Sequence, residues 1–374
     1  MNLCEREPEI PVPRVEAQLN GGNPFVYANA FKIELENHRD TAMEGEVTLK
    51  AFGSQTQTNP PEEQIDGNEF EISAETLPEI GIAELELKLA AYEKTYKMAF
   101  FAPKKDATIT TEQNGALLTV CNGRIKFCTD SEYAHVCHSL TDTATGKEWL
   151  FSRYPSREAF AWWNPFFGGI RLWPGINNNA ILKEKISAHF TNATDCFGNE
   201  WHGICTRLQM TEDEERKGAL YETYFVTLPG LPIFCTFFKL YNGTGIFHNR
   251  ELTLDMFFNI SGNFENIRVE LANKRHEKLL LPLGKLEQES YFENVVKIYE
   301  KESNEKLYVF HNNRNNGKVN NMDSDNKYPA RVNIEMNAVA APGETFVSSP
   351  TFLIISELEL ANGELDGLER VQFT

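Results

Sequence analysis

The chain has 374 residues, of which 41% are hydrophobic and 24% charged, and its formal net charge at pH 7 is −18. This length exceeds what one ordinary core occupies and predicts two domains, while the composition excludes wholesale disorder. A strongly negative chain repels nucleic-acid backbones and anionic membrane surfaces, so we expect neither as a partner, whereas neutral polar ligands fit.

The amino-terminal residues and the cysteines indicate a cytoplasmic protein without a metal or cofactor. Residues Met1–Glu7 contain neither the basic nor the apolar region of a secretory signal. No run reaches the roughly 18 to 20 apolar residues that span a bilayer. None of the seven cysteines forms a Cys-x-x-Cys pair, so we expect reduced, mostly buried thiols and no zinc site.

Residues 1–13 are rich in glutamate and proline, as interdomain linkers often are. We therefore expect a linker-like segment at this end. On this interpretation the chain is the C-terminal part of a larger carbohydrate-related enzyme.

Residues 14–103 show the period-two alternation of apolar and polar side chains that is typical of strands with one solvated face. Turn-rich stretches separate the alternating runs. Several short strands within about a hundred residues predict a small immunoglobulin-like β-sandwich. The runs are Phe31–Leu35, Val47–Leu49, Ala83–Leu89 and Tyr96–Phe100.

A linker that contains proline and two lysines, Ala102–Asp106, precedes residues 107–374, where strand patterns resume. Consecutive strands without helical crossovers predict a large two-sheet sandwich or barrel rather than a doubly wound α/β fold. The clearest strand patterns are Tyr224–Val226, Phe234–Leu240, Leu252–Phe258 and Phe352–Ile355.

One short segment of this second region has a helical pattern. Phe292, Val295, Ile298 and Tyr299 lie on one face at helical spacing and predict a helix over Phe292–Glu300. The segment Asn304–Lys327 is polar and rich in asparagine, and we expect a long loop or hairpin there.

The order of strands and turns in residues 107–374 resembles the galactose-mutarotase-like β-supersandwich. The matching features are Asn122–Phe127, Ser139–Glu148, the Gly-Gly segment Pro165–Ile170, the paired strands around Pro229–Gly230, and the Ala341–Glu344 turn. This family occurs as a free-standing epimerase and as a domain of many carbohydrate-active enzymes. The resemblance therefore implies an all-β fold and a saccharide or sugar-like ligand.

One signature of the epimerases is missing from this sequence. They carry their general acid in a segment of His-x-Tyr-Phe-Asn type, which does not occur here, and no glutamate is identified as the partner base. The resemblance therefore favours a domain that keeps the fold without the epimerase chemistry, because a fold does not fix a function.

The segment Phe160–Gly175 holds three tryptophans, three phenylalanines, three glycines and an arginine. Indole faces pack on sugar rings and indole N–H groups bond hydroxyls, while arginine clamps carboxylates or vicinal hydroxyls. In the alternative interpretation, the aromatic residues fill the core and Gly168 and Gly169 form a tight bend. The predicted ligand-binding residues of this segment are Trp162, Trp163, Asn164, Arg171 and Trp173.

Three polar residues on later strands are candidates for acid–base chemistry. Glu200 and His202 alternate along a predicted strand, so they share one face while Trp201 points to the other. Glu222 lies near the start of the strand Tyr221–Leu228. His202 is also a predicted ligand-binding residue. The alternative roles are structural: a hydrogen-bonded histidine beside a tryptophan, and solvated glutamates.

Two further motifs suggest metal ions but lack complete ligand sets. His135 and His138 have a His-x-x-His spacing, yet on a strand they would point to opposite faces, and no carboxylate motif completes them. Asp323–Lys327 imitates the start of a calcium loop without its glycine or its distal glutamate. We expect no metal site at either motif.

The sequence thus predicts a carbohydrate-binding or accessory β-sandwich module that recognises a saccharide or packs against a catalytic domain or partner protein. Two alternatives stay open. One is a sugar-active enzyme (epimerase, lyase or hydrolase) with Glu200, His202 or Glu222 at a cleft formed by Trp162–Gly175. The other is a structural or protein-interaction protein whose aromatic residues lie wholly in the core.

Overall fold

A computed structural model shows a chain built almost entirely from strands. It divides into two compact units, Met1–Ala102 with Gly363–Leu368 and Pro103–Asn362 with Glu369–Thr374. The predicted linker-like segment 1–13 lies outside the described residues. The structure describes residues 15–38, 45–51, 55–59, 69–73, 75–89, 92–159, 165–258, 266–273, 275, 277–282, 288–312, 317–321 and 330–374.

The first unit contains two antiparallel sheets, one of three strands and one of four. The three-stranded sheet has the order β1 (Val15–Leu19), β2 (Ala30–Asn37), β5 (Glu69–Ser73). The four-stranded sheet has the order β4 (Gln55–Asn59), β3 (Gly45–Ala51), β6 (Ile80–Leu89), β7 (Tyr92–Phe101). A short 3-10 helix, η1 (Asn20–Gly22), follows β1.

Apolar residues from both sheets of the first unit form one core. Ile33 and Leu35 of β2 and Leu85 and Leu87 of β6 are between 0% and 2% exposed, because alternation places them all on the inner faces. The four alternating runs predicted in this region lie in β2, β3, β6 and β7, which confirms them. The immunoglobulin-like assignment of this sandwich stays a prediction.

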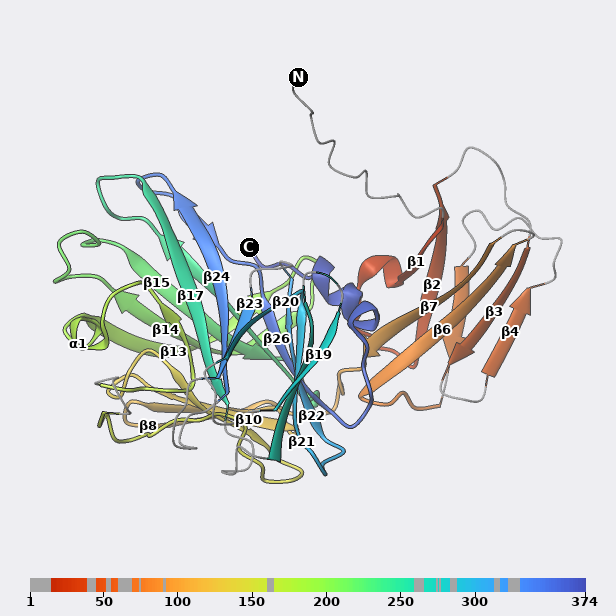
Figure 1. The fold of residues 1–374 in the computed structure, drawn as a ribbon, viewed down its shortest axis with the longest axis horizontal. Coiled ribbons are helices and arrows are strands. Elements are labelled where there is room, and N and C mark those ends of the chain that lie inside the picture. Colours follow the sequence, from red (N-terminus) through yellow and green to blue (C-terminus); the bar gives the residue numbers. More distant parts are fainter. Residues whose placement is uncertain are drawn as a thin grey trace, which may run out of the picture. The chain divides into compact units, whose positions relative to one another are not determined.

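The second unit contains two much larger sheets (Figure 1). The nine-stranded sheet has the order β20 (Gln288–Phe292), β23 (Gly317–Asn321), β24 (Ala330–Ala340), β17 (His248–Phe258), β12 (Ile170–Trp173), β11 (Cys137–Asp142), β10 (Ile125–Asp130), β9 (Leu117–Cys121), β8 (Thr110–Asn114).

The second large sheet has ten strands. Its order is β13 (Lys185–Thr194), β14 (Glu200–Gln209), β15 (Leu220–Thr227), β16 (Ile233–Tyr241), β26 (Thr351–Ser356), β22 (Lys306–His311), β21 (Val295–Glu300), β18 (Ile267–Ala272), β19 (Lys278–Pro282), and β25 (Thr345–Val347) pairs with β16. The remaining elements are the one-turn helix α1 (Asn178–Ile181) and the 3-10 helix η3 (Asn362–Arg370).

The two large sheets enclose the main core of the molecule. Phe127 of β10 and Phe234 of β16 come from different sheets and meet edge to face, with ring centroids 5.2 Å apart. Edge-to-face pairs of this kind add to the stability that burial itself gives. The predicted all-β fold, with a large two-sheet sandwich after a smaller one, is confirmed. The strand patterns predicted for the second unit lie in β15, β16, β17 and β26.

The helix predicted over Phe292–Glu300 is wrong. Phe292 ends β20 of the nine-stranded sheet, and Val295–Glu300 forms β21 of the ten-stranded sheet. Phe292, Val296 and Ile298 are 0% exposed and all belong to the core. Strands covered on both faces lose the alternation of a half-buried strand, so their apolar runs resemble a short buried helix.

The loop or hairpin predicted over Asn304–Lys327 is also wrong in its described part. Lys306–His311 forms β22 and Gly317–Asn321 forms β23, and these strands belong to different sheets. Leu307 and Val309 are 0% exposed. The asparagine-rich residues on either side made the segment polar on average, so the sequence pattern did not reveal this short apolar strand. Residues 313–316 and 322–327, which include Asp323, lie outside the described residues.

Gly168 and Gly169 confirm the tight bend that their sequence predicts. Both have positive φ, 68° and 66°. A Cβ atom on Gly168 would lie 2.2 Å from the carbonyl oxygen of Phe151, and one on Gly169 would lie 2.2 Å from that of Cys137. Only glycine combines this backbone conformation with such close approach.

Among the described residues, no helix is long and apolar enough to cross a membrane. Their six cysteines are free thiols, of which Cys137, Cys205 and Cys235 are buried and Cys196 is exposed.

Candidate functional site

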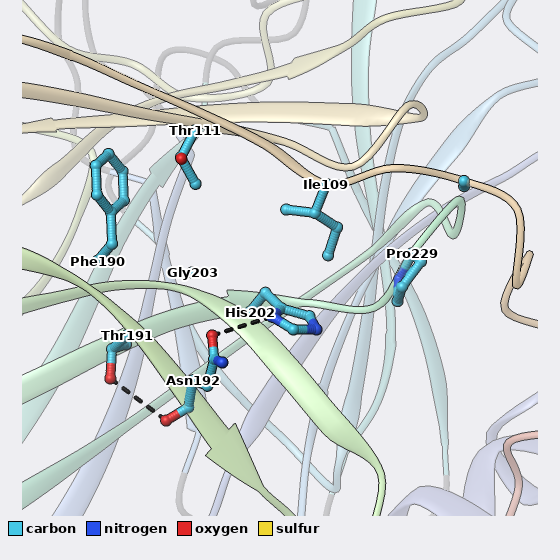
Figure 2. Close-up of a pocket in the computed structure, with 9 residues that line it drawn as sticks. Ile109, Thr111, Phe190, Thr191, Asn192, His202, Gly203 and Pro229 are labelled. Carbon is cyan, nitrogen blue, oxygen red and sulfur yellow. Dashed lines mark hydrogen bonds between the residues drawn. The ribbon is translucent and has the colours of Figure 1, made fainter.

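A pocket of the second unit lies between the free edges of its two sheets. β8 is the edge strand of the nine-stranded sheet, and β13 is the edge strand of the ten-stranded sheet. The cavity has a volume of about 300 Å³ (Figure 2). Its lining comes from β13, β14, β8 with the residues before it, and the loop after β15. The lining residues are Ala107, Ile109, Thr111, Phe190, Thr191, Asn192, His202, Gly203 and Pro229.

Strand alternation explains why the side chains of β13 and β14 line this pocket. Phe190 packs against the main core, and Asn192 follows it by two residues on the same face of β13. His202 in turn shares a face of β14 with Ile204, which is 0% exposed in the core. The polar residues therefore extend the inner faces of the sheets outward to the point where the core ends.

The pocket combines apolar and polar surfaces. Ile109, Phe190 and Pro229 supply apolar walls, and Thr111, Asn192 and His202 supply hydrogen-bonding groups. Ligand sites typically have volumes of roughly 300 to 1,000 Å³ and place a few polar groups on a largely apolar lining. This cavity is at the small end of that range.

A chain of three side chains crosses the rim of the pocket. The amide nitrogen of Asn192 donates to Oε1 of Glu200 at 2.9 Å. Oδ1 of Asn192 lies 3.0 Å from Nδ1 of His202 (Figure 2). The prediction that Glu200 and His202 share a face opposite Trp201 is confirmed, since Trp201 is 0% exposed on the other side.

A buried asparagine fixes the loop that carries Pro229. Asn122 is 0% exposed, and its amide nitrogen lies 2.7 Å from Oγ1 of Thr227 and 2.7 Å and 2.8 Å from the carbonyl oxygens of Leu228 and Leu231. Thr227 pairs directly with His202 across β15 and β14. In the sequence, Asn122 stood out only as the first residue of the family-like feature Asn122–Phe127, yet it supports one wall of the pocket.

Gly203 brings two strands unusually close beside His202. A Cβ atom at this position would lie 1.8 Å from the carbonyl oxygen of Phe225 in β15. No side chain fits there without moving the backbone. The pocket therefore has a fixed boundary on the side of β14 and β15.

Glu222 lies on the opposite face of the ten-stranded sheet from His202. His202 pairs with Thr227, and Arg207 pairs with Glu222. Thr227 and Glu222 are five positions apart on one strand, so their side chains point to opposite faces. Glu222 accepts a hydrogen bond from Nε of Arg207 at 2.6 Å. Of the three predicted acid–base residues, the structure thus brings together Glu200 and His202.

Arg171 lies in a buried polar row on the nine-stranded sheet. It pairs with Asp255, which in turn pairs with Asn333. Its guanidinium donates to Oδ1 of Asn178 at 2.7 Å and lies 3.4 Å from Oδ2 of Asp255. Arg171 is only 4% exposed, and burial lowers its pKa, partly offset by Asp255. Its predicted ligand role stays a prediction.

Trp173 is partly buried against the main core. Its indole N–H donates to the carbonyl oxygen of Ile176 at 2.6 Å, so this group already has an internal partner. Trp162, Trp163 and Asn164 lie outside the described residues, and their ligand-binding role stays a prediction.

His135 and His138 are built into the core. β11 begins at Cys137, so of the two only His138 lies on the strand. His138 stacks on Tyr154 with centroids 3.9 Å apart, and a nitrogen of His135 lies 2.8 Å from the carbonyl oxygen of Leu172. Burial lowers the pKa of each histidine to about 4. Both imidazoles are therefore neutral at pH 7.

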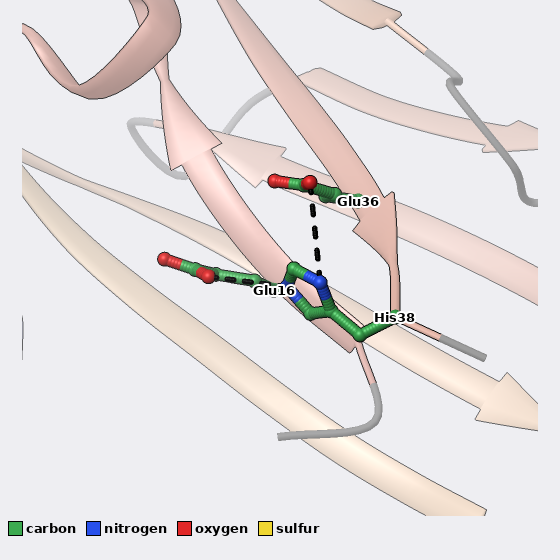
Figure 3. A group of neighbouring side chains, drawn as sticks. All are labelled: Glu16, Glu36 and His38. Carbon is green, nitrogen blue, oxygen red and sulfur yellow. Dashed lines mark hydrogen bonds and ion pairs between the residues drawn. The ribbon is translucent and has the colours of Figure 1, made fainter. Parts of the chain in front are cut away.

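A histidine with two carboxylates occurs in the first unit, on the surface of its three-stranded sheet (Figure 3). Glu16 and Glu36 are direct cross-strand partners. Nε2 of His38 lies 3.3 Å from Glu16 and Nδ1 lies 3.9 Å from Glu36. The two contacts use different ring nitrogens, whereas a metal ion binds one. In this arrangement the imidazole bridges two like charges that oppose each other across the strands.

Sequence reasoning missed the facing wall of the pocket. It singled out His202 but not Asn192 or Phe190, which lie on β13, or Ile109, which directly precedes β8. Within β13, the alternation of Ile186, Ala188 and Phe190 marks the inner face on which Asn192 also lies. The pairing of Asn192 with His202 depends on strand register, which no local pattern shows.

No family model and no curated protein matches the sequence. Solved structures do resemble it. A galactose mutarotase-like protein from Clostridium acetobutylicum has a TM-score of 0.47 at 11% identity over 68% of this chain and 100% of that one. A TPR-domain-containing protein from Parabacteroides distasonis has a TM-score of 0.46 at 11% identity over 74% of this chain. This chain spans 50% of the TPR-domain protein's length.

A putative aldose 1-epimerase from Klebsiella pneumoniae has a TM-score of 0.43 at 8% identity, over 75% of this chain and 84% of that one. Galactose mutarotase-like proteins are thus among the solved structures that this chain resembles, as its sequence suggested. Likeness at this level describes the general arrangement of strands and does not extend to ligand or reaction.

Proposed function

We propose that the second unit is a binding module for a small neutral saccharide, which occupies the pocket between β8 and β13. The observation that supports this most is the meeting of Phe190 with the Asn192–His202 pair in one cavity. An aromatic face packs on the C–H face of a sugar ring, while an amide and an imidazole bond its hydroxyls.

The size and charge of the site favour one neutral sugar ring. A cavity of about 300 Å³ suits a ligand with few heavy atoms. Glu200 carries negative charge at the rim, and the whole chain has a net charge of −18. Anionic ligands are therefore repelled both locally and at long range.

Titration calorimetry of the full chain against a panel of neutral monosaccharides and disaccharides tests this proposal. We expect at least one sugar to bind, and His202→Ala to weaken its binding about tenfold or more, because one lost hydrogen bond to a ligand typically has that effect. Phe190→Leu keeps the contact of this side chain with the core but removes its flat face, and we expect a similar loss.

The matched control is Glu222→Gln, which changes the same sheet on its other face and should leave binding unchanged. Circular dichroism of each variant confirms that it is folded. The proposal fails if no sugar of the panel binds, or if the sugar that binds does so equally well in the His202 and Phe190 variants.

A sugar-active enzyme is the second candidate, because Glu200 and His202 are linked through Asn192. An imidazole oriented by a hydrogen-bonded neighbour is the usual form of a general base. Proton NMR of reducing sugars and of aryl glycosides, incubated with the full chain, would show anomeric exchange or bond cleavage. We expect His202→Gln to abolish any such reaction, and a reaction that persists in this variant excludes this pocket as its site.

A further inference from the structure

The hydrogen bonds at the rim of the pocket determine which ring nitrogen of His202 carries its proton. The first step is the orientation of the Asn192 side chain. The ionised carboxylate of Glu200 only accepts hydrogen bonds. The Asn192 atom 2.9 Å from Glu200 Oε1 must therefore be the amide nitrogen, because an amide oxygen there would face the carboxylate without a proton between them.

The second step concerns the other end of the same amide. With its nitrogen turned to Glu200, Asn192 presents Oδ1 to His202, 3.0 Å from Nδ1. An amide oxygen accepts hydrogen bonds and cannot donate them. Nδ1 of His202 must therefore carry a hydrogen. In the neutral imidazole this leaves Nε2 with a free lone pair.

The third step is the position of Nε2. Figure 2 shows it on the side of the ring that points away from Asn192. His202 lines the cavity together with Ile109 and Pro229. Within the described part of the chain, no residue forms a hydrogen bond with Nε2 of His202. This acceptor is thus available to a ligand.

We propose that Asn192 and Glu200 are positioning residues that hold His202 as the Nδ1–H tautomer, so that the pocket selects ligands that donate a hydroxyl hydrogen to Nε2. This inference rests on the proposed function of the pocket for its ligand class. Groups that only accept, such as ring oxygens, ether oxygens and carboxylates, find no donor at this nitrogen. The hydroxyl that reaches Nε2 therefore determines specificity.

Nitrogen NMR measures the tautomer directly. In the ¹⁵N-labelled full chain at neutral pH, without ligand, long-range proton–nitrogen correlations of His202 should show a protonated Nδ1 and an unprotonated Nε2. Asn192→Ala removes the acceptor of Nδ1–H, and Glu200→Gln removes the group that orients the amide. We expect both variants to shift the population toward the Nε2–H form, with the larger shift in Asn192→Ala.

Thr191→Ala is the matched control, because Thr191 is adjacent on β13 and lines the same pocket, and its hydroxyl bonds the Asn192 carbonyl rather than His202. It should leave the two nitrogen signals of His202 unchanged. A wild-type spectrum with Nε2–H, or an Asn192→Ala spectrum identical to wild type, overturns the inference even if a sugar binds.

The claim that a ligand hydroxyl donates to Nε2 is tested with the tightest-binding monosaccharide of the panel and its analogues that each lack one hydroxyl. We expect one analogue to lose about tenfold or more in affinity for the wild type, because it leaves Nε2 without its partner. In the Asn192→Ala variant, the affinity of the same analogue should be close to that of the parent sugar. Equal affinities of all analogues for the wild type overturn this claim. A correct tautomer without any sugar binding overturns the proposed function and leaves the positioning roles standing.

Discussion

Two polar rows cross the two large sheets, and they differ in where they lie. The row Arg171–Asp255–Asn333 crosses central strands of the nine-stranded sheet, and its three residues are between 1% and 4% exposed. The row Asn192–His202–Thr227 starts at the free edge of the ten-stranded sheet. In the central row, side chains of the protein surround Asp255. In the edge row, Nε2 of His202 has no hydrogen-bond partner among the residues that the structure describes.

Strand register alone therefore does not determine what a polar row does. Cross-strand neighbours always interact, so both rows form hydrogen bonds by the same geometry. In mid-sheet, burial makes each contact a requirement for folding. At the edge of a sheet, hydrogen bonds of the same kind orient a side chain, here His202, that still faces a cavity. If the central row is structural and the edge row functional, substitutions in the two rows should affect stability and binding differently.

The largest effect of a single substitution is expected for Asp255→Ala. Asp255 accepts from Arg331 at 2.7 Å and lies 3.4 Å from Arg171. Its loss leaves two guanidinium groups without their shared carboxylate, and breaking a buried pair in this way costs about 3 to 5 kcal/mol. Urea unfolding of the full chain measures the change in the free energy of unfolding, and Asp255→Asn, which keeps the shape, shows how much of it is due to charge. A cost below about 1 kcal/mol would mean that the central row is not structural.

A sizeable pH effect is expected from three buried histidines. Burial lowers the pKa of His135, His138 and His311 from the ordinary value of 6.5 to about 4. Between these two values the unfolded chain binds more protons than the folded one. The stability they contribute is therefore complete above pH 6.5 and is lost as the pH falls toward 4, by roughly 3 kcal/mol for each histidine.

Urea unfolding at pH 7 and at pH 4.5 measures this loss. The variant His311→Gln removes one of the three groups, so its stability should fall less over the same interval. An equal fall in the variant and the wild type would show that His311 does not titrate as its burial implies.

The smallest effect is expected for Glu222→Ala. The Arg207–Glu222 pair has side chains that are 47% and 16% exposed, and such surface pairs contribute less than about 1 kcal/mol. Because Glu222 lies on the other face from His202, sugar binding should not change either. A clear loss of binding in this variant would mean that the two faces are coupled, which would weaken the contrast between the rows.

The sequence was sufficient for the class of fold and for most half-buried strands. Alternation located β2, β6 and β17 because each has one solvated or polar face. It failed at β21, where the run Val295–Ile298 is buried on both sides. It also failed at β22, where asparagine-rich residues on both sides surround a short apolar stretch of sequence. Periodicity measures the contrast between two faces, and it has no signal where both faces are covered.

The candidate site was only half visible in the sequence. Glu200 and His202 could be paired because they are two positions apart on one strand. Asn192, which links them, lies on the neighbouring strand, and its register is set by the whole β13–β14 hairpin. Arg171 carried the right chemistry for a ligand, yet its partner Asp255 is 84 residues away. Contacts at this separation depend on topology, which residue type alone does not determine.

The close approach at Gly203 has a consequence for how this pocket can change in evolution or by design. One boundary is closed to variation, because any Cβ atom at position 203 would meet the backbone of β15. The opposite wall is built from edge residues such as Ile109 and Thr111, which follow no such restriction. New ligand preferences should therefore be sought by exchanging side chains on the β8 side. The β14 side serves as a constant template that keeps His202 in place while the rest of the pocket is varied.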